Sequence, residues 1–149
     1  MSKELVVRFI TVGAFSENSY VVGCPESGHG VLIDPGGEVP ALLELAAEEG
    51  LEIDAIWLTH AHLDHVLGLG EAVQATAAPV WLHPDDRMLY DAAPQQGEAF
   101  GFPIDPLPPV DEPFDSGQQL QLGEHTARCC MYPGTAPATW RFGSPTPAW

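Results

Sequence analysis

The middle of the chain carries four side chains of the kinds that bind divalent metals. They follow an apolar run at residues 56–58, and they are His60, His62, Asp64 and His65. Neutral imidazole nitrogen and carboxylate oxygen are ligands that zinc accepts. Because four such groups this close together cannot easily all avoid one another, we predict a divalent metal site here rather than a set of solvated loop histidines.

The spacing within this cluster divides it into two pairs. His60 and His62 are separated by one residue, and side chains at i and i+2 of an extended segment point the same way, so both can face one ion. Asp64 and His65 follow where the chain turns toward a helix, so they can serve a second ion. Two metals roughly 3.5–4 Å apart can share a hydroxide and stabilise the transition state of a hydrolysis.

The elements that must position the cluster alternate between strand and helix after an antiparallel start. Apolar runs predict strands at residues 5–10, 19–22, 30–34, 53–58, 79–83 and 119–122. Helical spacing and end signals predict helices at residues 40–49, 68–78 and 84–90. The proline-rich residues 92–113 predict an irregular surface loop with room for one short helix. The fold class is therefore α/β or α+β, a mixed sheet with covering helices, and the cluster follows a strand, where sites in such sheets collect.

Composition limits the classes of partner. The 149 residues suffice for a single domain, and the net charge of -16, from 21 acidic and 5 basic side chains, argues against binding nucleic acid. No apolar stretch reaches the roughly 18–20 residues of a membrane span, and the N-terminus lacks the pattern of a secretory signal. Three cysteines make a poor disulfide framework. We therefore expect no nucleic acid, no membrane and a cytoplasmic location.

The segment from Thr59 to His65 resembles the His-x-His-x-Asp-His signature of the metallo-β-lactamase fold superfamily. Residues 18–22 and 31–37 resemble the opening hairpin of its glyoxalase II-like (hydroxyacylglutathione hydrolase-like) branch, and residues 78–83 resemble the strand after the signature. The resemblance covers roughly residues 5–124 and implies the N-terminal half of an αββα sandwich.

The resemblance also implies roles for individual residues. His60 and His62 would bind the first metal, Asp64 and His65 would bind the second, and Asp64 would also orient the attacking hydroxide. Asp34 matches a residue near the site in the family, although an acid that only ends a strand before a Pro-Gly-Gly turn explains it as well. The metal would be zinc in a two-metal site, with iron or manganese as alternatives. His29, His83 and His125 are isolated in sequence, and we assign them no ligand role.

The implied reaction is hydrolysis of a small-molecule substrate, a thioester such as a hydroxyacylglutathione, by a metal-bound hydroxide. Two alternatives stay open: a mononuclear iron relative of the persulfide dioxygenase kind, and an inactive truncated fragment that at most binds metal. The family's third histidine belongs after a Pro-Gly pair, but Thr135 stands there, and the chain has no counterpart of the last two ligands. We therefore expect an incomplete domain over residues 1–149, an uncovered sheet face, and self-association or poor solubility.

Residues 126–149 form a tail with neither clear alternation nor helical period. Back-translation from the third base of codon 130 permits the peptide H-V-P-G-H-S-P-G-H-V, which contains the missing Pro-Gly-His. We therefore expect the residues after about 125 to be translated out of frame, with natural divergence of the tail as the alternative.

Overall fold

A computed structural model gives the fold of most of the chain. It describes the backbone of residues 5–13, 16–59, 61, 63–82, 84–101, 104, 106–113, 119–122, 125–132 and 135–143, and it describes their side chains up to residue 111, residue 85 excepted.

A six-stranded mixed sheet forms the centre of the molecule, in the order β1-β2-β3-β4-β5-β6. Its strands are β1 (Val6–Val12), β2 (Glu17–Cys24), β3 (His29–Ile33), β4 (Glu52–Trp57), β5 (Val80–Leu82) and β6 (Glu112–Pro113). Valine and isoleucine are frequent in the first three strands, and their branched side chains suit a pleated surface. β1, β2 and β3 pair antiparallel, whereas β3, β4, β5 and β6 pair parallel. The mixed sheet predicted from the sequence is confirmed.

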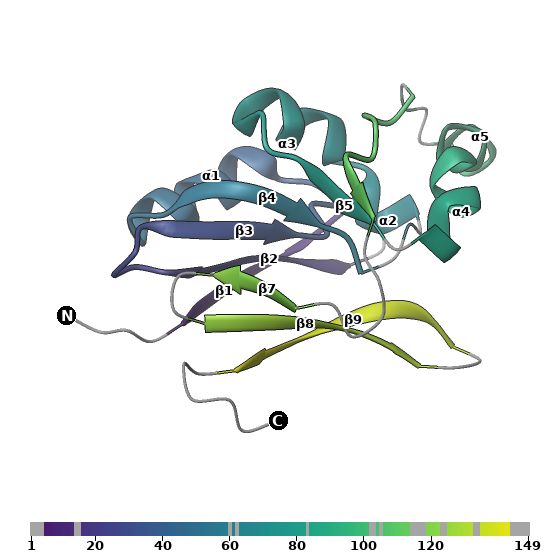
Figure 1. The fold of residues 1–149 in the computed structure, drawn as a ribbon. Coiled ribbons are helices and arrows are strands. Elements are labelled where there is room, and N and C mark those ends of the chain that lie inside the picture. The colour runs from purple at the N-terminus through teal and green to yellow at the C-terminus, as the bar shows by residue number, and fades with distance from the viewer. Residues whose placement is uncertain are drawn as a thin grey trace.

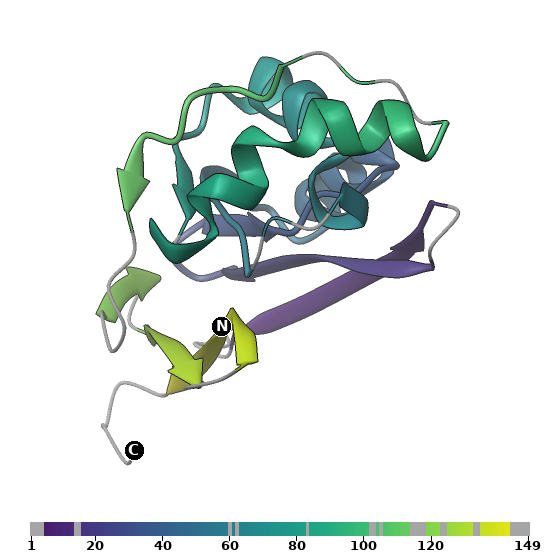
Figure 2. The ribbon, with the colours of Figure 1, turned by 90° about the vertical axis from the view of Figure 1, so that its right-hand side faces the viewer.

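Helices cover one face of this sheet (Figures 1 and 2). They are α1 (Val39–Glu48), α2 (Leu63–Val66), α3 (Leu69–Thr76), α4 (Arg87–Asp91) and α5 (Ala93–Ala99), with a short 3₁₀ turn η1 (Pro84–Asp86) before α4. Pro40 lies in the first turn of α1, as predicted, because proline needs no hydrogen-bond partner there. Among the described residues of the proline-rich segment 92–113, the regular elements are the seven-residue α5 and the two-residue β6. Tyr90 anchors that segment, because its hydroxyl donates to the carbonyl oxygen of Pro108.

The main core lies between the helices and the sheet. Leu32 of β3 faces Ile56 of β4 in the parallel register, and both side chains are fully buried. Leu42 of α1 and Leu69 of α3 pack into the same cluster and are equally buried. Burying one such side chain stabilises the fold by about 1.5–3 kcal/mol. This core fixes α1 and α3 on the sheet and thereby sets where the chain between β4 and α3 can run.

Two glycines form a notch at the hairpin end of the sheet. Gly23 of β2 and Gly30 of β3 are direct cross-strand partners. A Cβ atom on Gly23 would lie 2.6 Å from a methyl carbon of Leu51, and one on Gly30 would lie 3.1 Å from the same carbon. Leu51, which is 8% exposed, thus fills space that any other residue at these two positions would occupy. We call Gly23, Gly30 and Leu51 the glycine notch.

A second, three-stranded antiparallel sheet lies on the face opposite the helices (Figure 1). It contains β7 (Gln119–Leu122), β8 (His125–Tyr132) and β9 (Thr135–Gly143). The strand predicted at residues 119–122 is confirmed, whereas β8 and β9 lie where the sequence predicted no regular element. That miss has a simple cause, since the segment lacks the alternation that identifies a half-buried strand. The out-of-frame origin of residues 126–149 stays a prediction.

The sheet face on the side of β7–β9 is apolar, and among the side chains described on it the exposed large apolar ones lie on β1. Val22 and Val31 are cross-strand partners on this face and are buried, and so is Ile33. Val7 and Phe9 of β1 lie on the same face and are 52% and 58% exposed. The expectation of an uncovered sheet face is therefore wrong for β3 and right for β1. Self-association through this face stays a prediction.

None of the helices in the part of the chain described is both long and apolar enough to cross a membrane.

Candidate metal centre

The centre lies where β3 and β4 end side by side. Parallel strands bring their carboxyl ends to the same edge, so Asp34 after β3 and Thr59 after β4 meet there. The Thr59 backbone N–H donates to Asp34 Oδ1 over 2.7 Å, and its hydroxyl donates to Asp34 Oδ2 over 2.6 Å. Asp34 itself has a φ of 51°, a left-handed conformation that aspartate tolerates better than most residues. Asp34 therefore ties together the two loops that carry the site.

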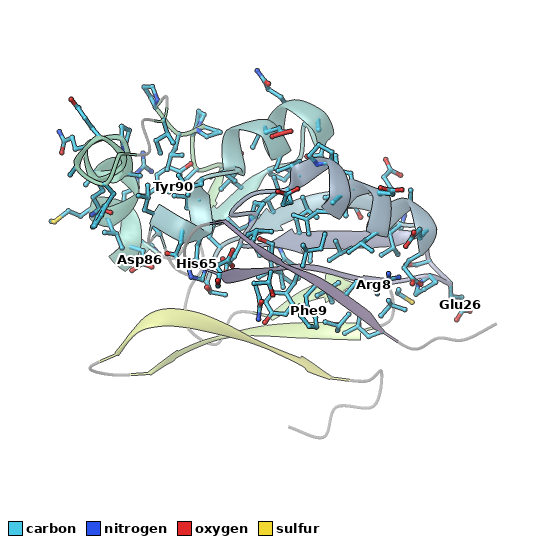
Figure 3. The ribbon with its side chains drawn as sticks, turned by 180° about the vertical axis from the view of Figure 1, so that it is seen from behind. Arg8, Phe9, Glu26, His65, Asp86 and Tyr90 are labelled. Atoms are coloured by element: carbon cyan, nitrogen blue, oxygen red, sulfur yellow. The ribbon has the colours of Figure 1, made fainter. Side chains whose placement is uncertain are left out.

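His65 of α2 has one ring nitrogen toward two carboxyl groups and the other toward a third. Nδ1 lies 3.0 Å from Asp34 Oδ2 and 3.4 Å from Glu17 Oε1. Nε2 lies 3.5 Å from Asp64 Oδ2. Figure 3 shows His65 at the end of the large sheet opposite Glu26. The structure thus brings together Asp64, His65 and Asp34, all noted in the sequence. His60 and His62 lie outside the described residues.

Glu17 joins the site without any prediction from the sequence. It is 6% exposed, and its neighbour on the same strand face, Ser19, is fully buried. A signal existed, because Glu17 and Ser19 occupy the alternating positions that continue through the buried Val21, so a carboxyl at that phase must point inward.

The hydrogen bonds around Ser19 fit the protonated form of Glu17. The Ser19 hydroxyl oxygen lies 2.7 Å from the Asp34 carbonyl oxygen and 3.1 Å from Glu17 Oε2, and it accepts the Gly36 N–H over 3.0 Å. A hydroxyl has one proton to donate and two lone pairs. If that proton goes to the Asp34 carbonyl, a protonated Glu17 Oε2 supplies the remaining hydrogen bond to the Ser19 hydroxyl.

The directions of the pKa shifts agree with a protonated Glu17. Burial, helped by the nearby Asp34 and Asp64 charges and opposed by His65 and Ser19, raises the pKa of Glu17 to about 8. Burial lowers the pKa of His65, but the hydrogen bond and charge of Asp34, with the charges of Glu17 and Asp64, outweigh it and leave the pKa raised. The metal-free site at neutral pH therefore favours a neutral Glu17 beside the His65–Asp34 contact.

The turn after β3 fits against the site only because it contains glycine. A Cβ atom on Gly36 would lie 2.5 Å from Glu17 Oε2 and would collide with the backbone carbonyl oxygen of Asp64. The same turn contacts the helical layer, since the Gly68 N–H donates to the Pro35 carbonyl oxygen over 3.0 Å. Gly36 thus lies wedged between Glu17 and Asp64.

These donor groups fit a divalent metal. Ligands bonded at about 2.0–2.2 Å around a tetrahedral ion lie about 3.3–3.6 Å from one another. The 3.5 Å between Asp64 Oδ2 and His65 Nε2 matches that spacing. The opposite ring nitrogen faces Asp34, which is how the imidazole of a metal ligand is commonly oriented. Glu17, Asp34 and His65 also place one donor atom each within 4.8 Å of one another.

A second group of similar composition lies at the other end of β3. It consists of His29, Glu52 and Asp54, all exposed, with donor atoms within 4.8 Å of one another. His29 Nδ1 lies 2.8 Å from Asp54 Oδ2. His29 is isolated in the sequence, because the parallel register that places it beside Glu52 is visible only in the fold. His83 and the side chain of His125 lie outside the described residues.

Comparison with known proteins gives one family. Residues 12–135 match the family model of the Metallo-beta-lactamase superfamily. The hydroxyacylglutathione hydrolase GloC of Haemophilus influenzae is 32% identical over 133 residues, which are 88% of this chain and 62% of that protein. A hydroxyacylglutathione hydrolase of Methylobacillus flagellatus is 36% identical over 115 residues, which are 77% of this chain and 40% of that protein. The chain thus spans less than two thirds of the length of these relatives.

Solved structures agree on the fold. The protein TTHA1623 in a di-iron-bound form is 39% identical, with a TM-score of 0.73 over 93% of this chain and 67% of that one. The B3 metallo-beta-lactamase BLEG-1 is 28% identical, with a TM-score of 0.76 over the same shares of 93% and 67%. The fold class predicted from the sequence is confirmed by both.

Proposed function

Because the chain belongs to the metallo-beta-lactamase superfamily, we propose that it contributes a metal centre to a hydrolase that cleaves a small thioester such as a hydroxyacylglutathione. The observation that carries the proposal is the convergence of Asp64 Oδ2 and His65 Nε2 at 3.5 Å. The names of the Haemophilus and Methylobacillus relatives support the substrate class. We also propose a reducing, cytoplasmic setting, since three cysteines make a poor disulfide framework.

Four residues would hold the metals. His60 and His62 would bind one ion, and Asp64 and His65 a second. We propose zinc, since imidazole and carboxylate are ligands that it accepts. The di-iron form of TTHA1623 makes iron the first alternative, and manganese suits the same donors.

A bound divalent metal supplies a water of lowered pKa as nucleophile and polarises the substrate carbonyl. The protein's own groups do the positioning. Asp64 presents a carboxylate oxygen beside His65 Nε2, where it can accept a hydrogen bond from the attacking water. Asp34 keeps the His65 ring oriented through Nδ1, and Thr59 in turn fixes both oxygens of Asp34.

Metal content is the first test. Purified protein loaded with zinc, iron or manganese and then desalted should retain metal, measured by elemental analysis. The H65A variant should retain less, and the matched variant H29A, in the exposed group, should retain as much as the wild type. Equal retention by H65A and wild type would remove Asp64 and His65 from the ligand set.

Thioester turnover is the second test. Hydrolysis of lactoylglutathione should be abolished by a chelator and by the D64A variant, and D54A should not affect it. Metal binding without turnover would instead favour the inactive-fragment alternative. Oxygen consumption with glutathione persulfide by the iron-loaded protein would favour the dioxygenase alternative.

A further inference from the structure

Glu17 is a buried carboxyl for which the proposed reaction has no role. We propose that it is a positioning residue for the ligand pair Asp64 and His65, an inference that rests on the proposed metal centre. Glu17 lies at the start of β2, on the strand face toward α2, and is 6% exposed. Its two oxygens reach the two ligand residues by separate routes.

The first route is direct contact with the imidazole. Glu17 Oε1 lies 3.4 Å from His65 Nδ1, the nitrogen that Asp34 Oδ2 approaches to 3.0 Å. This Oε1 is buried and has no hydrogen-bond partner in the part of the chain described. A buried acceptor left in that condition costs stability, so its place beside the ring is better explained by the site than by the fold. With two oxygens against one corner of the ring, Nε2 stays directed toward Asp64.

The second route passes through the turn after β3. Glu17 Oε2 is hydrogen-bonded to the Ser19 hydroxyl, which also accepts the Gly36 N–H. Gly36 separates Oε2 from the Asp64 carbonyl oxygen so closely that a Cβ atom there would contact both. Removing the Glu17 side chain would open a space on one side of this turn. The backbone of Asp64 could then shift, and its carboxylate would no longer be held beside His65 Nε2.

The variants E17A and E17Q separate positioning from charge. E17A removes both routes, and we expect the dissociation constant for Zn²⁺ to rise about tenfold or more, as for other residues that orient metal ligands. E17Q keeps the shape and the hydrogen bond to Ser19, and we expect a change below about threefold. N18A, at an exposed position of the same strand, should leave the constant unchanged.

Zn²⁺ affinity is measured by competition with a chromophoric chelator, under conditions where circular dichroism shows each variant to be folded. L42A, a destabilising core variant remote from the site, shows whether lost stability alone weakens binding; we expect its affinity to equal that of the wild type. If E17A does not fold, S19A replaces it, because it breaks the second route and keeps the carboxyl.

The outcomes are distinct. Wild-type affinity in E17A, or in S19A where that variant stands in, overturns the role of Glu17 and leaves the metal centre intact. Equal losses in E17A and L42A reduce Glu17 to a stability role. A wild-type chain that binds no zinc, iron or manganese refutes the proposed centre and this inference with it.

Discussion

The two ends of β3 carry groups of the same composition in opposite surroundings. Glu17, Asp34 and His65 lie at one end and are buried or nearly so, while His29, Glu52 and Asp54 lie at the other and are exposed. Both groups bring one imidazole and two carboxyls within 4.8 Å. The inner group is held by hydrogen bonds from Thr59, Ser19 and the backbone, whereas the outer group has a single ion pair at its centre. Residue type and spacing alone therefore do not distinguish a site from a surface cluster.

The difference is one of electrostatics as much as of geometry. Water screens charges on the surface, so an exposed ion pair contributes about 0–1 kcal/mol. In the interior the same charges interact strongly and must be neutralised or paired. Glu17 responds by a raised pKa, and His65 responds by pairing with Asp34. Substitutions at the two ends of β3 should consequently differ in how strongly they affect stability.

The largest effect is expected from D34A. It removes both hydrogen bonds to Thr59 and the contact with His65, and it leaves alanine at a φ of 51°. We expect a loss of about 3–4 kcal/mol in the free energy of unfolding of the metal-free protein, measured by urea denaturation with chelator present. D34N should lose less, because asparagine tolerates this conformation. A D34A variant as stable as the wild type would mean that the inner group does not hold the loops together.

G36A should come next. The new Cβ atom would meet the Asp64 carbonyl oxygen and Glu17 Oε2, neither of which can move freely. We expect a loss of about 2–3 kcal/mol in the same denaturation experiment. G37A is the matched control in the same turn, because its Cβ would lie 3.6 Å from the Val12 side chain, an ordinary contact. Similar losses in both variants would show that the turn responds to lost glycine flexibility and not to crowding.

E17Q should change how stability depends on pH. The folded-state pKa of Glu17 is about 8 against an ordinary value of 4.5, so the folded protein holds this proton more tightly than the unfolded chain. The metal-free wild type should therefore lose stability between about pH 5 and pH 8, and E17Q, which cannot ionise there, should lose less. Thermal unfolding across this range with chelator present measures it. Parallel curves for the two proteins would contradict a neutral, buried Glu17.

The smallest effect is expected from D54A in the outer group. It breaks the ion pair with His29, whose side chain is 49% exposed, and we expect a change of about 0–1 kcal/mol. Metal content by elemental analysis should also stay at the wild-type value. A loss of bound metal in D54A would place a second binding site at the outer end.

The sequence predicted the family, the mixed sheet and the cluster after β4 because each depends on local signals. Asp64 and His65 are adjacent in the chain, so no knowledge of the fold was needed to pair them. Glu17 was missed because it reaches His65 only through the β2–β3 register and the position of α2. β8 and β9 were missed because their sequence lacks alternation. Whether residues after about 125 are out of frame stays a prediction, and the nucleotide sequence of codons 120–150 tests it.

The glycine notch has a consequence for the far end of its two strands. Because Leu51 fits only over paired glycines, a slip of β2 along β3 by one residue would set the side chain of Val22 or Cys24 against Gly30 and displace Leu51. The glycine notch therefore fixes the register of β2 against β3. The same register places Ser19 beside Asp34 and directs Glu17 toward α2. A larger residue at Gly23, far from any metal ligand, would displace Leu51 and shift β2 along β3. That shift would move Ser19 and Glu17 and so disturb the metal centre.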